Sequence, residues 1–319
     1  MNQDADKFSL LDDSAIKLPL HRFAHEAMNT IFGVSVLGGK IEYAQSAARA
    51  AFEEVDRLER LLSRFIEGSD VWRINHLEAG HWAPVSTDTL RCLQLAEGIC
   101  DETNGAFDIS IGRLLTYWRK SNRPVDRDGV RAFNEAAVRT GMELLQISER
   151  ACGVGVKARG VQIDLGGIGK GYAVDRMMEL LREWDMGTIL THGGQSTVRA
   201  TGSICDHKGW PLTLRNPEKP SEVWVRFDLR DQSLSASGRL IQGEHIVDPR
   251  TCEPARGKVR VWVLAKSAAL SDAVSTAFMV MSPDEIEQYC QNHKDVGTIL
   301  ASTTSEGCQM RHMGADFTK

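Results

Sequence analysis

Hydrophobic and polar positions follow two different periods along this chain. Over residues 45–65, the apolar side chains recur every three to four residues, which places Ala48, Phe52, Val55 and Leu58 on one face. This pattern predicts an amphipathic helix that packs against the core. Other segments alternate with the period of two that is typical of strands. The remaining predicted elements are helices over residues 86–103 and 172–184, and strands over residues 31–37, 161–165, 188–191, 223–229 and 259–265.

The order of these elements lacks a regular strand–helix–strand alternation. We therefore expect an α+β fold with mixed sheets and packed helices rather than a doubly wound parallel sheet. A polar stretch over residues 120–128 contains Pro124 and is a candidate boundary. We expect an N-terminal extension over residues 1–24 and a single domain over residues 25–319.

Composition narrows the class of protein. The 319 residues are 42% hydrophobic and 25% charged, as in an ordinary globular protein, and the net charge of −5 without a basic tract argues against nucleic-acid binding. No apolar run reaches the length of a membrane span, and the first 27 residues lack the apolar core of a secretory signal. The seven scattered cysteines form no Cys-x-x-Cys pair. We expect a cytoplasmic protein with reduced thiols, no zinc site and no membrane insertion.

Residues 161–175 combine a carboxylate, four glycines and a lysine at a predicted strand-to-helix turn. Glycine permits positive φ and close approach of a ligand, and the start of a helix favours an anion, to which Lys170 adds a positive charge. The P-loop pattern fails because Gly171 follows Lys170 where Ser or Thr is required, and the dinucleotide fingerprint fails on spacing. The segment indicates a polyphosphate site, or alternatively a tight turn whose glycines serve only packing.

Residues 265–281 form a helix so apolar that we expect both of its flanks to be buried. Asp272 lies inside it, and a buried carboxylate normally finds a cation, a hydrogen-bond donor or a proton. Ser275 and Thr276 follow three and four residues later, on the same helical face. These hard oxygen ligands favour Mg²⁺ over Ca²⁺, which usually takes more protein oxygens. The alternative is that Asp272 caps the start of a helix.

Three further positions carry possible chemistry. His245 lies in a polar loop before Asp248-Pro249, where it could transfer a proton or serve a structural hydrogen bond. Phe65 and Phe107 could stack on a flat ring, although aromatic side chains at such positions are more often core residues. Asp108 could accept a hydrogen bond from a hydroxyl or from a backbone amide.

Eight short motifs occur together in a characteristic order. They are Ala27-Met-Asn-Thr30, Leu62-Ser-Arg-Phe65, Gly105-Ala-Phe-Asp108, Ile163-Asp-Leu-Gly-Gly-Ile-Gly-Lys-Gly-Tyr172, Gly193-Gly194, Ser235-Ala-Ser-Gly238, His245-Ile-Val-Asp-Pro-Arg-Thr251 and Asp272-Ala-Val-Ser-Thr276. In these motifs and their order, the chain resembles the ApbE family, the FAD:protein FMN transferases, over about residues 25–302.

The resemblance implies a two-lobed α+β fold with a flavin cleft, in which Mg²⁺ assists transfer of FMN from FAD to a Thr or Ser hydroxyl of an acceptor flavoprotein, with release of AMP. Such a transfer needs charge neutralisation and a well-placed hydroxyl more than covalent machinery. The implied proton acceptor is His245. The implied metal ligands are Asp272, Ser275, Thr276 and the carbonyl of Gly167, and the implied FAD contacts are Met28, Phe65, Ala106, Phe107, Asp108, Asp164, Lys170 and Ile246.

Two positions depart from the family pattern, since Asn29 and Cys252 stand where relatives usually have glycine. Many relatives are exported lipoproteins, whereas the start of this sequence carries no export signal, which favours a cytoplasmic acceptor. Two other activities remain open from the sequence. Water could attack in place of a protein hydroxyl, which would make the protein an FAD pyrophosphatase that releases FMN and AMP. Alternatively, the protein could bind FAD without catalysis.

Overall fold

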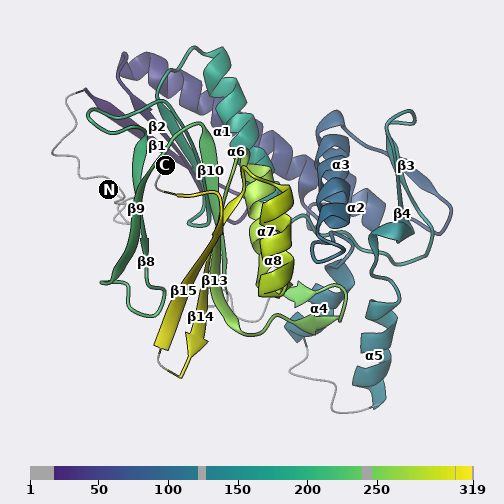
Figure 1. Ribbon diagram of the computed structural model, residues 1–319. Helices are drawn as coiled ribbons and strands as arrows, with labels where there is room; N and C mark the ends of the chain where they lie inside the picture. Colours follow the sequence, from purple (N-terminus) through teal and green to yellow (C-terminus); the bar gives the residue numbers. More distant parts are fainter. Residues whose placement is uncertain (1–17, 121–126, 239–245, 306, 318–319) are drawn as a thin grey trace.

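The computed structural model describes residues 18–120, 127–238, 246–305 and 307–317. Its centre is an eight-stranded sheet with the order β1-β2-β6-β7-β10-β13-β14-β15 (Figure 1). All of these neighbours are antiparallel. The strands are β1 (Leu20–Ala27), β2 (Thr30–Leu37), β6 (Ile189–Gly193), β7 (Thr197–Thr201), β10 (Gln232–Gly238), β13 (Lys258–Ala265), β14 (Gly297–Thr304) and β15 (Gly307–Gly314).

Three helices cover one face of this sheet: α1 (Ile41–Leu62), α6 (Gly169–Glu183) and α7 (Ala268–Val280) (Figure 1). The predicted helix over residues 45–65 corresponds to α1, which buries the expected apolar face. It ends at Leu62 because Ser63 is extended (ψ 125°). α7 is buried on nearly all sides, as its composition predicts, and packs on β10, β13 and α6.

The opposite face of the sheet is covered by the hairpin of β8 (Trp210–Arg215) and β9 (Val223–Leu229). Trp210, Leu212 and Phe227 of this hairpin share a buried cluster with Leu234 of β10 and Leu264 of β13. The sheet is therefore buried on both faces over this region, and β13 separates two different hydrophobic clusters.

A second group of elements lies beside the large sheet (Figure 1). The predicted helix over residues 86–103 is confirmed as α3, and Ser86 caps it by accepting a hydrogen bond from the backbone N–H of Thr89. The main hydrophobic cluster contains residues from both groups, for example Ile74, Leu93, Val174 and Phe278. The elements of this group are α2 (Asp70–Asn75), β3 (Trp82–Pro84), α3 (Thr87–Glu102), α4 (Gly112–Lys120), α5 (Arg127–Ala137), a 3₁₀ turn (Met142–Leu144), β4 (Leu145–Ser148) and β5 (Gly153–Val156).

The α+β class is confirmed, but the sheets are antiparallel rather than mixed. Each pair of named strands is antiparallel, including β11 (Val247–Asp248) with β12 (Glu253–Pro254), and one isolated parallel bridge joins Ile111 to Gln162. The connection between β13 and β14 shows why neighbouring strands run antiparallel. Two helices, α7 and α8 (Pro283–Asn292), connect them, so that the chain re-enters the sheet in the opposite direction.

One predicted strand and one predicted domain boundary differ from the structure. The segment over residues 161–165 is not a strand, because its backbone groups bond to Ile109, Gly112 and the side chain of Asn75 instead of a neighbouring strand. The expected division between residues 24 and 25 falls inside β1, whose first residues already pair with β2. The candidate boundary over residues 120–128 lies mainly outside the described residues.

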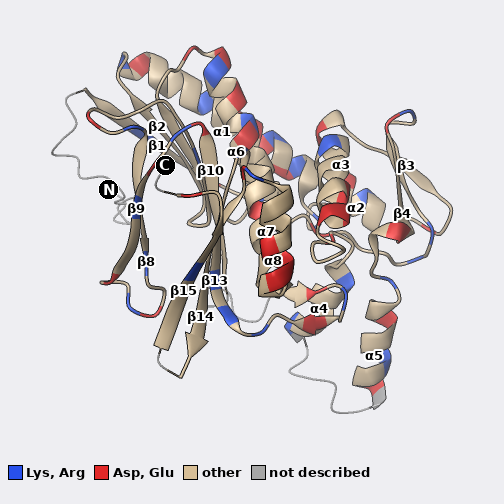
Figure 2. Ribbon diagram, in the orientation of Figure 1, with Lys and Arg blue, Asp and Glu red and all other residues tan. Residues whose placement is uncertain are grey.

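Charged residues of both signs are interspersed over the molecule. Figure 2 shows Lys and Arg alternating with Asp and Glu along α1, and i,i+4 pairs such as Arg49 with Glu53 occur there. Across the described ranges, no helix is long and apolar enough to cross a membrane.

Candidate functional site

The chain turns sharply just before α6. The side chain of Asn75 holds Ile163 from both sides, with its Oδ1 2.6 Å from the backbone N and its Nδ2 3.0 Å from the backbone O. The carbonyl of Leu165 then accepts hydrogen bonds from the N–H groups of Ile168 (3.0 Å) and Gly169 (2.7 Å), and α6 begins at Gly169. The helix thus starts three residues earlier than the sequence predicts.

The glycines of this turn permit close approach rather than unusual backbone angles. None of Gly166, Gly167, Gly169 and Gly171 has positive φ, so the turn does not use the freedom that glycine offers there. A Cβ on Gly171 would lie 2.2 Å from the carbonyl oxygen of Ala268 at the start of α7. Packing is therefore one role of these glycines, and it brings the first turn of α6 directly against α7.

Asp272 of α7 accepts hydrogen bonds from this first turn of α6 and from the side chain of Thr197 on β7. Its Oδ2 lies 3.1 Å from the backbone N of Gly171 and 3.4 Å from Nζ of Lys170, and only 4% of its side chain is exposed. Burial raises the pKa of Asp272, while Lys170 and the Gly171 amide act against this rise. Lys170 also donates to the carbonyl of Gly166 (2.9 Å). A positive charge and a helix start therefore face one buried carboxylate.

The cap of α7 itself comes from other residues. The alternative role of Asp272, as a cap at the start of a helix, is observed at α6, where it accepts from the backbone N–H of Gly171, and not at α7. Ser267 accepts a hydrogen bond from the backbone N of Leu270 (3.3 Å). Asp175 of α6 accepts from the N–H groups of Ala268 (2.8 Å) and Ala269 (2.9 Å). Two helices thus exchange carboxylates, since Asp175 of α6 bonds to the start of α7 and Asp272 of α7 to the start of α6.

Hydroxyl groups surround the same point. Ser275 and Thr276 donate to the carbonyl of Asp272 at 2.9 Å and 3.1 Å, and Ser237 of β10 lies 2.8 Å and 3.2 Å from their hydroxyl oxygens. Gly167 completes the group, because a Cβ on it would lie 3.4 Å from Oγ1 of Thr276. All four residues implied as metal ligands are therefore adjacent.

This set of donors suits a hard divalent cation. It offers one carboxylate, two or three hydroxyls and a nearby backbone carbonyl, and oxygen ligands of this kind, completed by water and substrate phosphate, are typical of Mg²⁺. A metal site built mainly from carboxylates, His or Cys would look different, because it would gather several such side chains around one point. Within the described residues, no group of three or more His, Cys, Asp or Glu side chains could hold a metal ion.

Asp164 is held at the entrance to the turn by Arg64. Nη1 of Arg64 lies 2.9 Å from Oδ2 of Asp164, and Oδ1 accepts from the backbone N of Gly166 (2.7 Å). The Arg64 guanidinium also lies 5.1 Å from the centre of the Phe65 ring. Phe65 is 76% exposed. Phe65 is therefore not a core residue, and its ring is available to a ligand.

The other residues implied in flavin binding lie in or near the main hydrophobic cluster. Phe107 is buried and faces Gly167, since a Cβ on that glycine would lie 3.2 Å from its ring. Asp108 is buried and accepts from the backbone N of Ser110 (2.7 Å), and burial raises its pKa. Ala106, Ile246 and half-buried Met28 belong to the same cluster. His245 lies outside the described residues.

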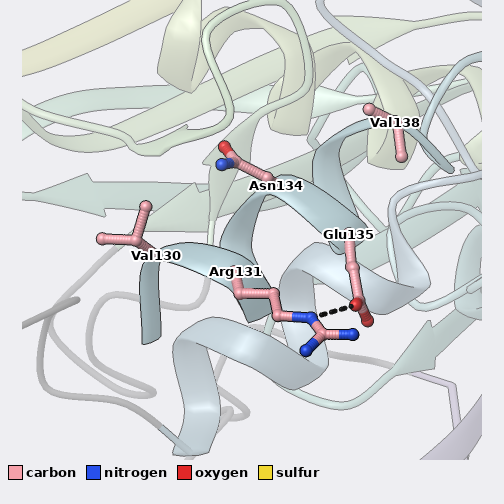
Figure 3. Close-up of a pocket in the computed structure, with 5 residues that line it drawn as sticks. All are labelled: Val130, Arg131, Asn134, Glu135 and Val138. Carbon is pink, nitrogen blue, oxygen red and sulfur yellow. Dashed lines mark hydrogen bonds and ion pairs between the residues drawn. The ribbon is translucent and has the colours of Figure 1, made fainter. Parts of the chain in front are cut away.

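A hollow on α5 lies apart from these residues. Its lining comes from α5 and the residue after it, with an ion pair between Arg131 and Glu135 at one side (Figure 3). None of the residues implied in metal or flavin binding contributes to it. The lining residues are Val130, Arg131, Asn134, Glu135 and Val138.

Comparison with known proteins decides the family. The ApbE family model matches residues 28–300. The chain belongs to the ApbE family. Among curated relatives, an "FAD:protein FMN transferase" of Klebsiella pneumoniae is 28% identical and covers 82% of this chain and 79% of its own length. One of Escherichia coli K12 is 23% identical, with coverage of 88% and 83%.

Solved structures of the family share the fold. The ApbE protein of Thermotoga maritima superimposes with a TM-score of 0.79 at 26% identity and covers 92% of this chain and 97% of its own. The flavin transferase ApbE of Vibrio cholerae gives a TM-score of 0.81 at 21% identity, with coverage of 92% and 98%.

The two departures from the family's glycines keep the backbone shape of glycine. Asn29 has φ 56° and Cys252 has φ 61°, both in the left-handed region that favours glycine. Asn29 lies in the turn between β1 and β2, and Cys252 in the turn between β11 and β12. Both turns therefore hold a left-handed residue at a position where this chain has no glycine.

Sequence reasoning left three residues of the site without a role. Ser237 ends a run of serines at positions 233, 235 and 237 of β10, all of which bond to hydroxyls of α7. This period-two pattern was the available signal. Arg64 lies inside a quoted motif and Asp175 at the end of the segment over residues 161–175, but their partners, Asp164 and the start of α7, are about a hundred residues away in sequence.

Proposed function

We propose that this protein transfers FMN from FAD to a threonine or serine hydroxyl of an acceptor flavoprotein, with release of AMP and with Mg²⁺ at the Asp272 site. The observation that carries the proposal is the contact between the first turn of α6 and α7, where Lys170 and the Gly171 amide meet Asp272. Family membership and the names of the curated relatives support the same reaction.

In this proposal the cation is held by Asp272, Ser275, Thr276 and the carbonyl of Gly167. When bound, the metal neutralises charge on the diphosphate of FAD and so lowers the barrier to phosphoryl-type transfer. Lys170 and the start of α6 supply further positive potential at the same place. The protein's own part is to position the diphosphate between two fixed elements.

The remaining residues would hold the two ends of FAD and the acceptor. Phe65 offers an exposed ring, and Phe107 lies behind Gly167. We assign His245 as the proton acceptor for the attacking hydroxyl, on the strength of its position in the family's motif. The further FAD contacts in this proposal are Met28, Ala106, Asp108, Asp164, Lys170 and Ile246.

The test is mass spectrometry of a candidate acceptor flavoprotein co-expressed with this protein. The expected result is an acceptor heavier by one FMN less one water, with the adduct on a Thr or Ser. Asp272→Ala should abolish the adduct. Asp206→Ala, which replaces an exposed carboxylate outside the candidate site, should not. An adduct of equal yield with Asp272→Ala would contradict the proposed site.

A parallel incubation with FAD and Mg²⁺ but no acceptor separates the three activities. A transferase releases AMP slowly until acceptor is added. Rapid AMP release without acceptor would indicate a pyrophosphatase, and retention of FAD without AMP under either condition would indicate a binding protein.

A further inference from the structure

Arg260 lies on the far side of the large sheet from the candidate site. It is paired with Gly238 of β10, and the preceding residue of that strand, Ser237, points to α7. Side chains alternate between the two faces of a strand, so Arg260 points to the face that carries the β8–β9 hairpin. Figure 1 shows α7 and this hairpin on opposite faces of the sheet.

Arg260 is a half-buried cation without a carboxylate partner among the described residues. Burial alone lowers its pKa, with no acidic side chain acting against it. Acidic side chains of the turn between β8 and β9 bond elsewhere, since Glu218 accepts from Thr303 (2.6 Å) and Glu222 from Asn216 and Trp224. An unpaired charge in this position costs stability, which folding alone does not explain.

The guanidinium rests on a platform of tryptophans. Its central carbon lies 5.3 Å from the Trp262 ring, and Trp224 meets Trp262 edge-on, with centroids 6.1 Å apart. A Cβ on Gly238 would lie 3.2 Å from Cγ of Arg260, so the glycine makes room for the arginine stem. A cation–π contact fixes the guanidinium while leaving its N–H groups free to donate.

An exposed apolar side chain continues this row. Ala301 of β14 lies opposite Arg260, and Met310 of the edge strand β15 lies opposite Ala301. Residues directly opposite in an antiparallel ladder share one face. Met310 is 43% exposed. Arginine and tryptophan beside exposed apolar surface are the residue types that dominate protein–protein binding energy.

We propose that Arg260 binds a carboxylate of the acceptor protein at a docking surface that includes half-buried Trp224 and exposed Met310, with buried Trp262 supporting the guanidinium. This inference rests on the proposed function, because it names the surface that receives the acceptor. The acceptor is favoured over FAD because the sheet itself separates Arg260 from the contact between Lys170 and Asp272. The charge complement of a guanidinium that is fixed and has no carboxylate partner in the described part of the chain is a carboxylate, which it binds through paired N–H donors.

The test compares steady-state FMN transfer by wild type and Arg260→Met, with the acceptor identified by co-expression. Methionine keeps an apolar stem on Trp262 but removes the charge. The KM for acceptor should rise roughly tenfold, as expected for loss of one charge-assisted hydrogen-bonded pair, while the KM for FAD stays within twofold. Arg226→Met, an exposed position on β9, is the matched control and should change neither KM.

A double-mutant cycle identifies the partner. Each Asp and Glu of the acceptor is replaced by Asn or Gln, and one such variant should raise the KM for acceptor with wild type but not with Arg260→Met. Chemical denaturation supplies a second measurement, because a purely structural arginine would make Arg260→Met less stable, whereas removal of an unpaired charge should leave the stability unchanged or higher.

The outcomes are distinguishable. An unchanged KM for acceptor in Arg260→Met, or no acceptor acid that couples to Arg260, refutes this inference and leaves the proposed function intact. A raised KM for FAD instead assigns Arg260 to the flavin substrate and refutes the acceptor role. A wild-type protein that transfers no FMN to any acceptor refutes the proposed function and this inference with it.

Discussion

At the scale of single residues, Gly171 sets the distance between the two helices of the candidate site. Gly171→Ala places a methyl group 2.2 Å from the carbonyl oxygen of Ala268, which the backbone of α7 can relieve only by moving away. We expect a loss of about 1–3 kcal/mol in the free energy of unfolding. Urea denaturation of the variant measures it.

Gly169→Ala is the matched control. Its added methyl group would meet nothing closer than Cβ of Leu165 at 3.7 Å, an ordinary contact. Alanine favours helix, so this variant should be as stable as wild type or more stable by up to about 1 kcal/mol. Equal destabilisation by both substitutions would show that close helix contact is not the reason for glycine at position 171.

A second prediction at this scale concerns the two turns that lack the family's glycine. Cys252 holds φ 61° with only a weak thiol hydrogen bond, from its Sγ to the carbonyl of Pro249 at 3.7 Å, whereas asparagine tolerates this region through stronger local hydrogen bonds of its side chain. Cys252→Gly should therefore stabilise the protein by up to about 1 kcal/mol. Asn29→Gly, at φ 56°, should bring no gain. Thermal unfolding of the two variants measures the effect. A larger increase in Tm for Asn29→Gly than for Cys252→Gly would contradict this prediction.

At the scale of elements, α6 and α7 are joined by reciprocal contacts at their starts. Asp175 of α6 pairs with Arg199 of β7 and accepts two N–H groups of α7. Asp175→Ala leaves Arg199 buried without its partner and should cost about 3–5 kcal/mol of unfolding free energy. Ser267→Ala, which removes only the N-cap of α7, should cost about 1 kcal/mol. Chemical denaturation measures both. Similar losses of unfolding free energy in the two variants would argue against Asp175 as the main contact that holds α7 against α6.

The other end of α7 has a pH-dependent contact. Lys258 of β13 donates to the carbonyls of Met279 (3.5 Å) and Met281, and burial lowers its pKa to about 8. In the unfolded chain a lysine keeps its proton to about pH 10.4. Between these two values the unfolded chain binds more protons, so the free energy of unfolding rises with pH across this window.

Lys258→Met removes this dependence. The difference in unfolding free energy, wild type minus variant, should increase by roughly 1–3 kcal/mol between pH 7.5 and pH 10. Urea denaturation at the two pH values measures it. A difference that stays constant or decreases would contradict a lowered pKa for Lys258.

How much of each element could be predicted depends on where its hydrogen bonds go. α1, α3 and β9 follow from local period and capping residues, because a helix or an alternating strand records its buried face in the sequence. Residues 161–165 misled the same reasoning. They read as a strand, but their partners are Asn75 and the segment near Ile109, distant in sequence and invisible to any local pattern.

At the scale of the whole molecule, the antiparallel sheet order could not be derived from the sequence. β2 pairs with β6 across some 150 intervening residues, and that insertion holds the second group of elements with Asp164 and Arg64. The candidate site could be predicted because its motifs are short and each retains its chemistry alone. The contact between these motifs, and the position of Ser237 between them, depends on the topology of the sheet and could not be predicted from the sequence.

The same topology gives the sheet two distinct faces. One carries α6, α7 and the oxygen-rich candidate site, and the other carries the β8–β9 hairpin and the Arg260 surface. Separate faces allow the flavin substrate and the acceptor protein to be bound by different residues. Substitutions on the two faces should therefore act on different kinetic constants.

We propose that a divalent cation at Asp272 lies against the diphosphate of FAD at the start of α6. Binding of Mn²⁺ in place of Mg²⁺, followed by electron paramagnetic resonance and by ³¹P relaxation of FAD, tests it most directly. Wild type should bind Mn²⁺ and strongly relax both phosphorus nuclei, and Asp272→Ala should lose both effects while it remains folded. Unchanged Mn²⁺ affinity and ³¹P relaxation in Asp272→Ala would show that Asp272 does not hold the cation beside the diphosphate.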